Sequence, residues 1–271
     1  MTRFIWARVM LLAAMFAAHG ATPSRAGDWD DIRNQIFGTQ PISDAATSTL
    51  VIYGPNQAAD GALVPISIHM PTATAKRAKT LTLVIDRNPA PIAATFHFGE
   101  VFRGGDDIAD RIVATRIRID DFSQVRAIVE TTDGEILMSA KFIAGAGGCS
   151  ALPSKDPDEA LASIGRMKVK LTAEPDQDPS WREGMVMLRH PNFTGMQMDP
   201  KRGGFTPARF VRELVIEQGD RLVMRMVGGI SISEDPNLRF TFASAADAPL
   251  VVSGEDTEGA KFAGRSDDPG S

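Results

Sequence analysis

The chain has 271 residues, of which 43% are hydrophobic and 23% are charged, and its formal net charge is −5 at pH 7. This length and composition allow one large domain or two domains of ordinary size, with a substantial apolar core. The acidic balance argues against a nucleic-acid partner, because phosphate binding requires a basic face.

The first 26 residues have the order of a secretory signal peptide. Arg3 and Arg8 precede an apolar run over 9–18, and Ser24 and Ala26 supply the small residues of a cleavage site. The apolar run is too short to span a bilayer, which takes about 20 residues. We therefore predict a signal peptide over 1–26, a periplasmic mature chain and no membrane insertion.

One short helix followed by strands is expected in the first half. A helix is predicted over 28–37, since Trp29, Ile32 and Ile36 recur at helical spacing. Strands are predicted over 49–54, 62–70, 80–86, 92–99 and 111–120, and a hairpin over 125–144 with its turn at Asp133-Gly134.

Two arginines stand out in the strand over 111–120. Alternation places Val113 and Ile117 on one face and Arg116 and Arg118 on the other. The arginines could hold an anionic cargo or partner, but a solvated polar face is the simpler interpretation.

The strand pattern of the sequence stops after residue 144 and resumes at residue 166. Small residues, prolines and charges predict a linker over 151–164. Further strands are predicted over 166–172, 184–190 and 238–244, with a hairpin over 210–226 that turns at Gly219-Asp220 and a short strand around Lys261-Phe262. A flexible tail is expected over 265–271.

Each half thus contains about 100 residues of short strands separated by turn signals every 8–12 residues. This pattern predicts an all-β protein of two immunoglobulin-like β-sandwich domains with a short N-terminal helix. The expected domains are 27–150 and 165–264, on either side of the linker.

The single cysteine, Cys149, lies in the sequence AGAGGCSALP. One cysteine cannot form an intramolecular disulfide, and an unpaired thiol in an oxidising compartment is buried, paired between molecules or kept for chemistry. Gly145, Gly147 and Gly148 remove bulk and add flexibility. A thiol on such a segment suits a swinging arm that enters partner active sites, and a linker that happens to contain a cysteine is the alternative.

Both halves resemble a known family. The first half, ending in AGAGGCS, resembles SoxY, the sulfur-carrying subunit of the thiosulfate-oxidising Sox system, whose arm ends in Gly-Gly-Cys-Gly-Gly. The second half resembles SoxZ through HPNFTGMQMDPKRGGFTPARFVREL (190–214) and GGISISEDPNLRFTF (228–242). The whole is similar to fused SoxYZ-like carriers associated with quinoprotein (PQQ-dependent) dehydrogenases. In this chain Ser150 and Ala151 follow the cysteine, and the arm is internal.

The resemblance implies a carrier that is not itself an enzyme and needs no cofactor. Cys149 would be the covalent attachment point for a sulfur compound such as thiosulfate, and Gly145, Gly147 and Gly148 would be the hinge of the arm. The implied partners are periplasmic Sox-type enzymes or quinoprotein dehydrogenases.

Two other functions stay open on the sequence. A non-catalytic interaction module would need no thiol. A periplasmic copper-binding protein could use His190 with Met185, Met187, Met196 and Met198 as soft ligands. We favour packing for these residues, with Met185 and Met187 facing inward, and therefore predict no metal site.

Two further features have ordinary interpretations. His97 is expected to face outward between Phe96 and Phe98. The acidic sequence GGDDIAD (104–110) lacks the ligand spacing of a calcium loop and is expected to be a turn.

Overall fold

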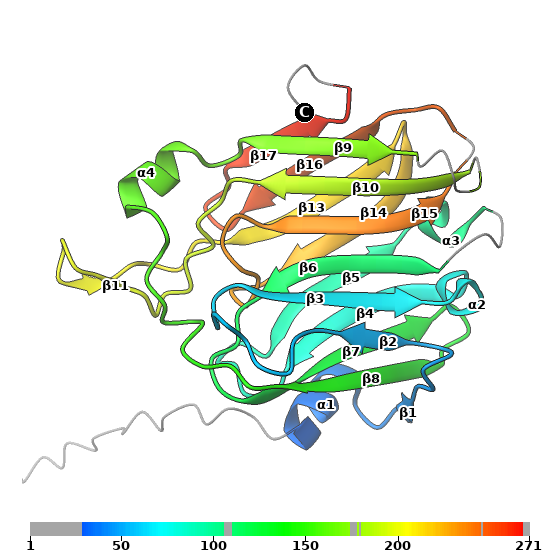
Figure 1. Cartoon of the computed structure of the whole chain (residues 1–271), viewed down its shortest axis with the longest axis horizontal. Helices are drawn as coiled ribbons and strands as arrows, with labels where there is room; N and C mark the ends of the chain where they lie inside the picture. The colour runs from blue at the N-terminus through cyan, green and yellow to red at the C-terminus, as the bar shows by residue number, and fades with distance from the viewer. Residues whose placement is uncertain (1–28, 106–109, 174–177, 179, 245, 268–271) are drawn as a thin grey trace, which may run out of the picture.

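Two β-sheets packed face to face form the body of the molecule in a computed structural model (Figure 1). The structure describes residues 29–105, 110–173, 178, 180–244 and 246–267. The predicted signal peptide and Asp106 and Asp107 lie outside these residues. Within them, no helix has the length and apolar character needed to cross a bilayer.

The larger sheet has nine strands in the order β1-β8-β7-β4-β5-β14-β13-β16-β17. Their bounds are β1 Ser43–Asp44, β4 Ala78–Ile85, β5 Ile92–Phe98, β7 Ser123–Thr131, β8 Ile136–Ile143, β13 Val211–Gln218, β14 Arg221–Gly228, β16 Leu250–Asp256 and β17 Lys261–Arg265.

The smaller sheet has six strands in the order β2-β3-β6-β15-β10-β9 and lies in front in Figure 1. Their bounds are β2 Val51–Tyr53, β3 Val64–Met70, β6 Arg111–Ile117, β9 Met167–Thr172, β10 Trp181–Leu188 and β15 Asn237–Ala243.

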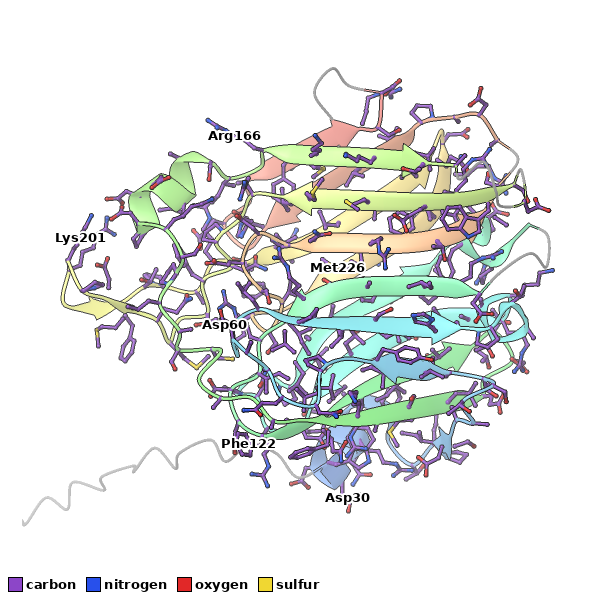
Figure 2. The ribbon with its side chains drawn as sticks, viewed as in Figure 1. Asp30, Asp60, Phe122, Arg166, Lys201 and Met226 are labelled. Atoms are coloured by element: carbon purple, nitrogen blue, oxygen red, sulfur yellow. The ribbon has the colours of Figure 1, made fainter. Side chains whose placement is uncertain are left out.

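Short elements complete the described fold. The helices are α1 Trp29–Phe37, α2 Thr72–Ala75, α3 Glu100–Arg103 and α4 Pro157–Ala162. The strands β11 Met198–Asp199 and β12 Gly204–Phe205 pair in a small hairpin that projects from one end of the sandwich beside α4 (Figures 1 and 2, Lys201). Helix α1 covers the nine-stranded sheet, where Ile32 packs with Val84, Ile128 and Ile136.

The prediction of an all-β fold with a short N-terminal helix is confirmed. Each half contributes strands to both sheets, so each half is a two-layer sandwich. The halves then join edge to edge, because β5 pairs with β14 in one sheet and β6 pairs with β15 in the other. Both sheets therefore continue from the first half into the second, and one buried apolar cluster extends through both.

The predicted hairpins form at the predicted turns. Strands β7 and β8 flank Gly134, which has φ +87°, and β13 and β14 flank Gly219, which has φ +65°. Glycine adopts such positive φ values without steric cost, which explains why these two turns are legible in the sequence.

Three details of the second half differ from the predictions. The linker contains α4, whose N-cap Asp156 accepts a hydrogen bond from the Asp158 amide at 3.0 Å. Strand β16 was not expected. Met185 and Met187 face outward, because Gly184, Val186 and Leu188 are the buried residues of β10. A Cβ at Gly184 would lie 2.3 Å from Phe240 Cζ, so the inward position opposite that ring must be glycine.

Candidate functional site at the Cys149 segment

The residues around Cys149 return to the sandwich after β8 and pack against the chain that follows β6. We call residues 145–151 the Cys149 segment. The Gly147 and Gly148 amides donate to the Asp120 and Ile119 carbonyls at 2.8 and 3.0 Å. The Cys149 amide donates to Asp120 Oδ1 at 3.0 Å. Backbone hydrogen bonds therefore hold the segment along one edge.

The glycines of the segment allow close packing in place of free movement. A Cβ at Gly148 would lie 2.1 Å from the Gly61 carbonyl oxygen, and one at Gly145 would lie 3.1 Å from Ile119. Figure 2 labels Asp60, the residue before Gly61, at the same end of the sandwich as the β11–β12 hairpin. Gly147 has φ +68° with open space around it.

The second half holds the other side of the segment. Thr194 Oγ1 donates to the Cys149 carbonyl at 2.6 Å, and Gln197 Nε2 donates to the Ala151 carbonyl at 3.0 Å. The Thr194 amide in turn donates to Gln197 Oε1 at 3.1 Å, which fixes the two side chains relative to each other. The segment thus lies between the halves and is bonded to both.

Arg118 lies beneath the segment and is 1% exposed. Its Nη1 donates to the Gly148 carbonyl at 3.1 Å and its Nη2 to the Asn192 carbonyl at 3.4 Å. Nε has no hydrogen-bond partner among the described residues. The prediction of a solvated face is therefore wrong for Arg118, because the Cys149 segment and the loop that contains Asn192 cover this end of the strand.

The Cys149 thiol is 0% exposed and unpaired. Burial raises its pKa to about 12; the charge of Asp120 adds to the rise, and that of Arg118 opposes it. Because the thiolate is the nucleophilic form, the thiol is unreactive in this arrangement. The expectation of an accessible thiol on a free arm is wrong for this conformation. Sequence reasoning missed that Arg118, Asp120 and Thr194 would converge on it.

Comparisons with known proteins identify both halves. Residues 33–149 match the family described as "Sulfur oxidation protein SoxY", and residues 169–267 match the family described as "Sulphur oxidation protein SoxZ". The chain is a fused SoxYZ-like protein. The SoxY match ends at Cys149, so the cysteine is the last matched residue of the SoxY half.

Among solved structures, the sulfur carrier protein SoxY from Chlorobium limicola f thiosulfatophilum is 21% identical to this chain. The match covers 43% of this chain and 90% of that one, with a TM-score of 0.32. No curated protein matches the chain.

His190, in the SoxZ half, supports the loop that contains Asn192 and Thr194. The histidine is 1% exposed. Its Nδ1 accepts from the Asn192 amide at 3.0 Å, and its Nε2 lies 3.3 Å from Asp256 Oδ2. Burial lowers the pKa of His190, and Asp256 opposes this effect. Nδ1 therefore supports the loop that holds Cys149, and Nε2 ties the ring to the end of β16.

Three of the four methionines considered as copper ligands lie on outward surfaces, whereas His190 is buried. Met185 and Met187 line hollows on the outer face of the six-stranded sheet, and Met198 lies exposed on the projecting β11. No group of three or more His, Cys, Asp or Glu side chains with metal-binding geometry occurs in the described part of the chain. On β5, His97 is half-buried between two buried phenylalanines, as the alternation predicts.

Proposed function

We propose that this fused SoxYZ-like protein is a sulfur carrier that holds a sulfur compound such as thiosulfate covalently on Cys149 and presents it to partner enzymes. Membership of the SoxY and SoxZ families supports this function. The choice of Cys149 as the attachment point is supported by its position, because the one cysteine of the chain lies on a glycine-rich connection between the two halves.

The carrier function requires the Cys149 segment to leave the position seen here, which we call the docked position. Ala146, Gly147 and Ser150 are already exposed. The chain between Ile143, which ends β8, and Pro157, which begins α4, lies outside regular helix and strand. Undocking therefore breaks side-chain and backbone hydrogen bonds to the segment without removing a strand from either sheet.

The docked position suits the unloaded protein. A buried thiol with a raised pKa resists oxidation, which is damaging in an oxidising compartment. A bound thiosulfonate adds bulk and negative charge to a sulfur that is 0% exposed. Overpacking costs about 1–3 kcal/mol and a buried charge costs more, so loading favours the undocked segment.

The loading reaction is an oxidation. The Cys149 thiolate and the terminal sulfur of thiosulfate form an S–S bond, RS⁻ + S₂O₃²⁻ → RS–S–SO₃⁻ + 2e⁻, and the thiol proton goes to solvent. The proposal assigns the two electrons to an oxidising partner enzyme, which the resemblance to the Sox system implies is haem-containing.

The location and the partners belong to the same proposal. A periplasmic location is supported by the signal-peptide pattern over 1–26. Sox-type enzymes are the expected partners, since both halves belong to sulfur-oxidation families. A link to a quinoprotein dehydrogenase is supported only by the sequence resemblance.

A non-catalytic interaction module is the second candidate, and the burial of Cys149 favours it. Intact-mass analysis separates the two. The protein is purified without reductant from thiosulfate-grown cells as wild type, Cys149→Ser and Ser150→Ala.

The carrier predicts a mass increase of one S₂O₃ group or its products in wild type and Ser150→Ala, absent from Cys149→Ser. An unmodified thiol under all growth conditions, with thiosulfate consumption unchanged in Cys149→Ser cells, would leave the interaction module as the function.

A further inference from the structure

The outer face of the six-stranded sheet carries several arginine and lysine side chains. Two rows of outward residues cross the sheet in register. One row runs Tyr53, Ser67, Ala114, Arg239, Met185 and Lys170, and the other contains Pro65 and Arg116 and then Asn237, Met187 and Lys168. Arg166 and Arg189 lie beyond the second row, where the chain enters β9 and leaves β10, and the Arg189 amide donates to the Arg166 carbonyl at 2.8 Å. Figure 2 labels Arg166 at this end of β9.

We define the basic face by its six cations. These are Arg116, Arg166, Lys168, Lys170, Arg189 and Arg239. Two carboxylates lie among them: Glu183 accepts from Arg239 at 3.2 Å, and Asp235 pairs with Arg189 and Lys155. Cations therefore outnumber carboxylates on this face, although the whole chain has a net charge of −5.

The basic face is hollowed and partly apolar. Two adjacent hollows of about 540 and 370 Å³ share Arg116 and Asn237. Met185 lines the first, and Met187 lines the second. Tyr53, at the rim of the first, is 53% exposed. Tyrosine, methionine and arginine are among the residues enriched in protein interfaces, and methionine adapts to different partners.

Arg116, at the point the hollows share, has an unused donor. Its Nη2 donates to the Asp235 carbonyl at 2.8 Å, but its buried Nε has no hydrogen-bond partner among the described residues. A buried donor without a partner is costly unless a ligand or water satisfies it.

We infer that the basic face binds an acidic surface of a partner protein. The size of the face decides between a protein and a small anion. The six cations lie on four neighbouring strands, β6, β15, β10 and β9, or at their ends, and at about 4.8 Å per strand spacing they span about 14 Å across the sheet. A small anion would contact two or three of these cations, whereas the apolar hollows between them match the side chains of a protein surface. The inference does not depend on the chemistry of Cys149.

The test measures binding of fluorescently labelled poly-L-glutamate, as an acidic polypeptide probe, to the full-length protein at low ionic strength. The double variant Lys168→Glu/Lys170→Glu reverses two outward charges of β9, of which Lys168 is half-buried and Lys170 is exposed. The matched control Lys261→Glu/Arg221→Glu reverses two charges on the nine-stranded sheet. Thermal melts check that both variants fold.

We expect wild type and control to bind equally, and the β9 variant to bind at least tenfold more weakly. Wild-type binding should weaken as salt shortens the Debye length from about 10 Å at 0.1 M to about 3 Å at 1 M. The bound probe should protect Lys168 and Lys170 from acetylation and leave Lys261 reactive.

Three results would overturn the inference. The first is absence of binding at low salt, and the second is equal loss in both double variants. The third is complete displacement of the probe by sulfate or thiosulfate at an ionic strength where sodium chloride does not displace it, which would assign the face to a small anion.

Discussion

Replacement of Thr194 by valine tests how the Cys149 segment is held. Thr194 is 4% exposed, and its hydroxyl makes two hydrogen bonds: it donates to the Cys149 carbonyl at 2.6 Å and accepts from the Met196 amide at 3.1 Å. Valine has nearly the same shape and removes only the hydroxyl. The change therefore isolates polar contacts between the SoxZ half and the segment.

The expected magnitude follows from these two bonds. The Cys149 carbonyl becomes a buried acceptor without its donor, which costs about 1–3 kcal/mol. The half-buried Met196 amide can bond to water and adds little. In the undocked segment water can bond to the carbonyl, so the free energy of undocking should fall by about 2 kcal/mol. The equilibrium constant for undocking then rises roughly 30-fold, at about 1.4 kcal/mol per tenfold change.

The assay is the rate at which a disulfide reagent such as dithionitrobenzoate labels Cys149 at pH 8. In the docked thiol, a pKa of about 12 against the ordinary 9.0 means ~1000-fold less thiolate, so labelling proceeds through the undocked state. Thr194→Val should react roughly 30-fold faster than wild type, and Thr194→Ser should react at a rate near wild type.

Global destabilisation needs its own control. Ile128→Ala weakens the separate cluster under α1 and should leave the labelling rate of Cys149 unchanged. Equal rates in wild type and Thr194→Val would refute the reasoning, as would an equal acceleration in Ile128→Ala.

Three further predictions concern the same segment. Gly148→Ala should expose Cys149 to fast labelling with little change in melting temperature, since the added Cβ would lie 2.1 Å from the Gly61 carbonyl oxygen. Gly147→Ala meets no atom but holds alanine at φ +68°, a strain of about 1–2 kcal/mol, so it should label faster than wild type and more slowly than Gly148→Ala; equal rates in the two variants would contradict this packing. Because the pKa of Cys149 is raised in the docked position, docking is fully stable below pH 9 and weakens as pH rises toward 12. The labelling rate of wild type should therefore keep rising about tenfold per pH unit past pH 9. A plateau in the rate near pH 9 would indicate an exposed thiol. Arg118→Met removes the donor to the Gly148 and Asn192 carbonyls, so it should lower the melting temperature and raise the labelling rate of Cys149. A melting temperature and a labelling rate equal to those of wild type would show that the guanidinium does not hold the segment.

Local patterns in the sequence were sufficient for much of the fold. The strands β7, β8, β13 and β14 form where period-two alternation meets a Gly turn, because both signals act over a few residues. Strand β10 overlaps the predicted strand over 184–190, but it begins and ends earlier and its faces are the reverse of those predicted. The inward position of Gly184 depends on the ring of Phe240 on the neighbouring strand, which alternation in one segment does not report.

The site was less predictable because its contacts are remote in sequence. Cys149 and its glycines were identified from local composition. Their docking depends on Arg118 and Thr194, which lie about 30 and 45 residues away and come from different halves. Alternation gave the direction of Arg118 from its strand, but the chain that covers it follows only from the assembled fold.

The central claim is that the Cys149 segment is docked when the thiol is free and undocked when the sulfur is loaded. Tetrathionate loads the thiol without an enzyme, RS⁻ + S₄O₆²⁻ → RS–S–SO₃⁻ + S₂O₃²⁻, and hydrogen exchange then compares the Gly147, Gly148 and Cys149 amides in loaded and free protein. The account predicts slow exchange in the free protein and fast exchange at these amides after loading, with β7 and β13 unchanged. Equally slow exchange in both forms would show that the adduct stays beside Arg118 and would contradict the account.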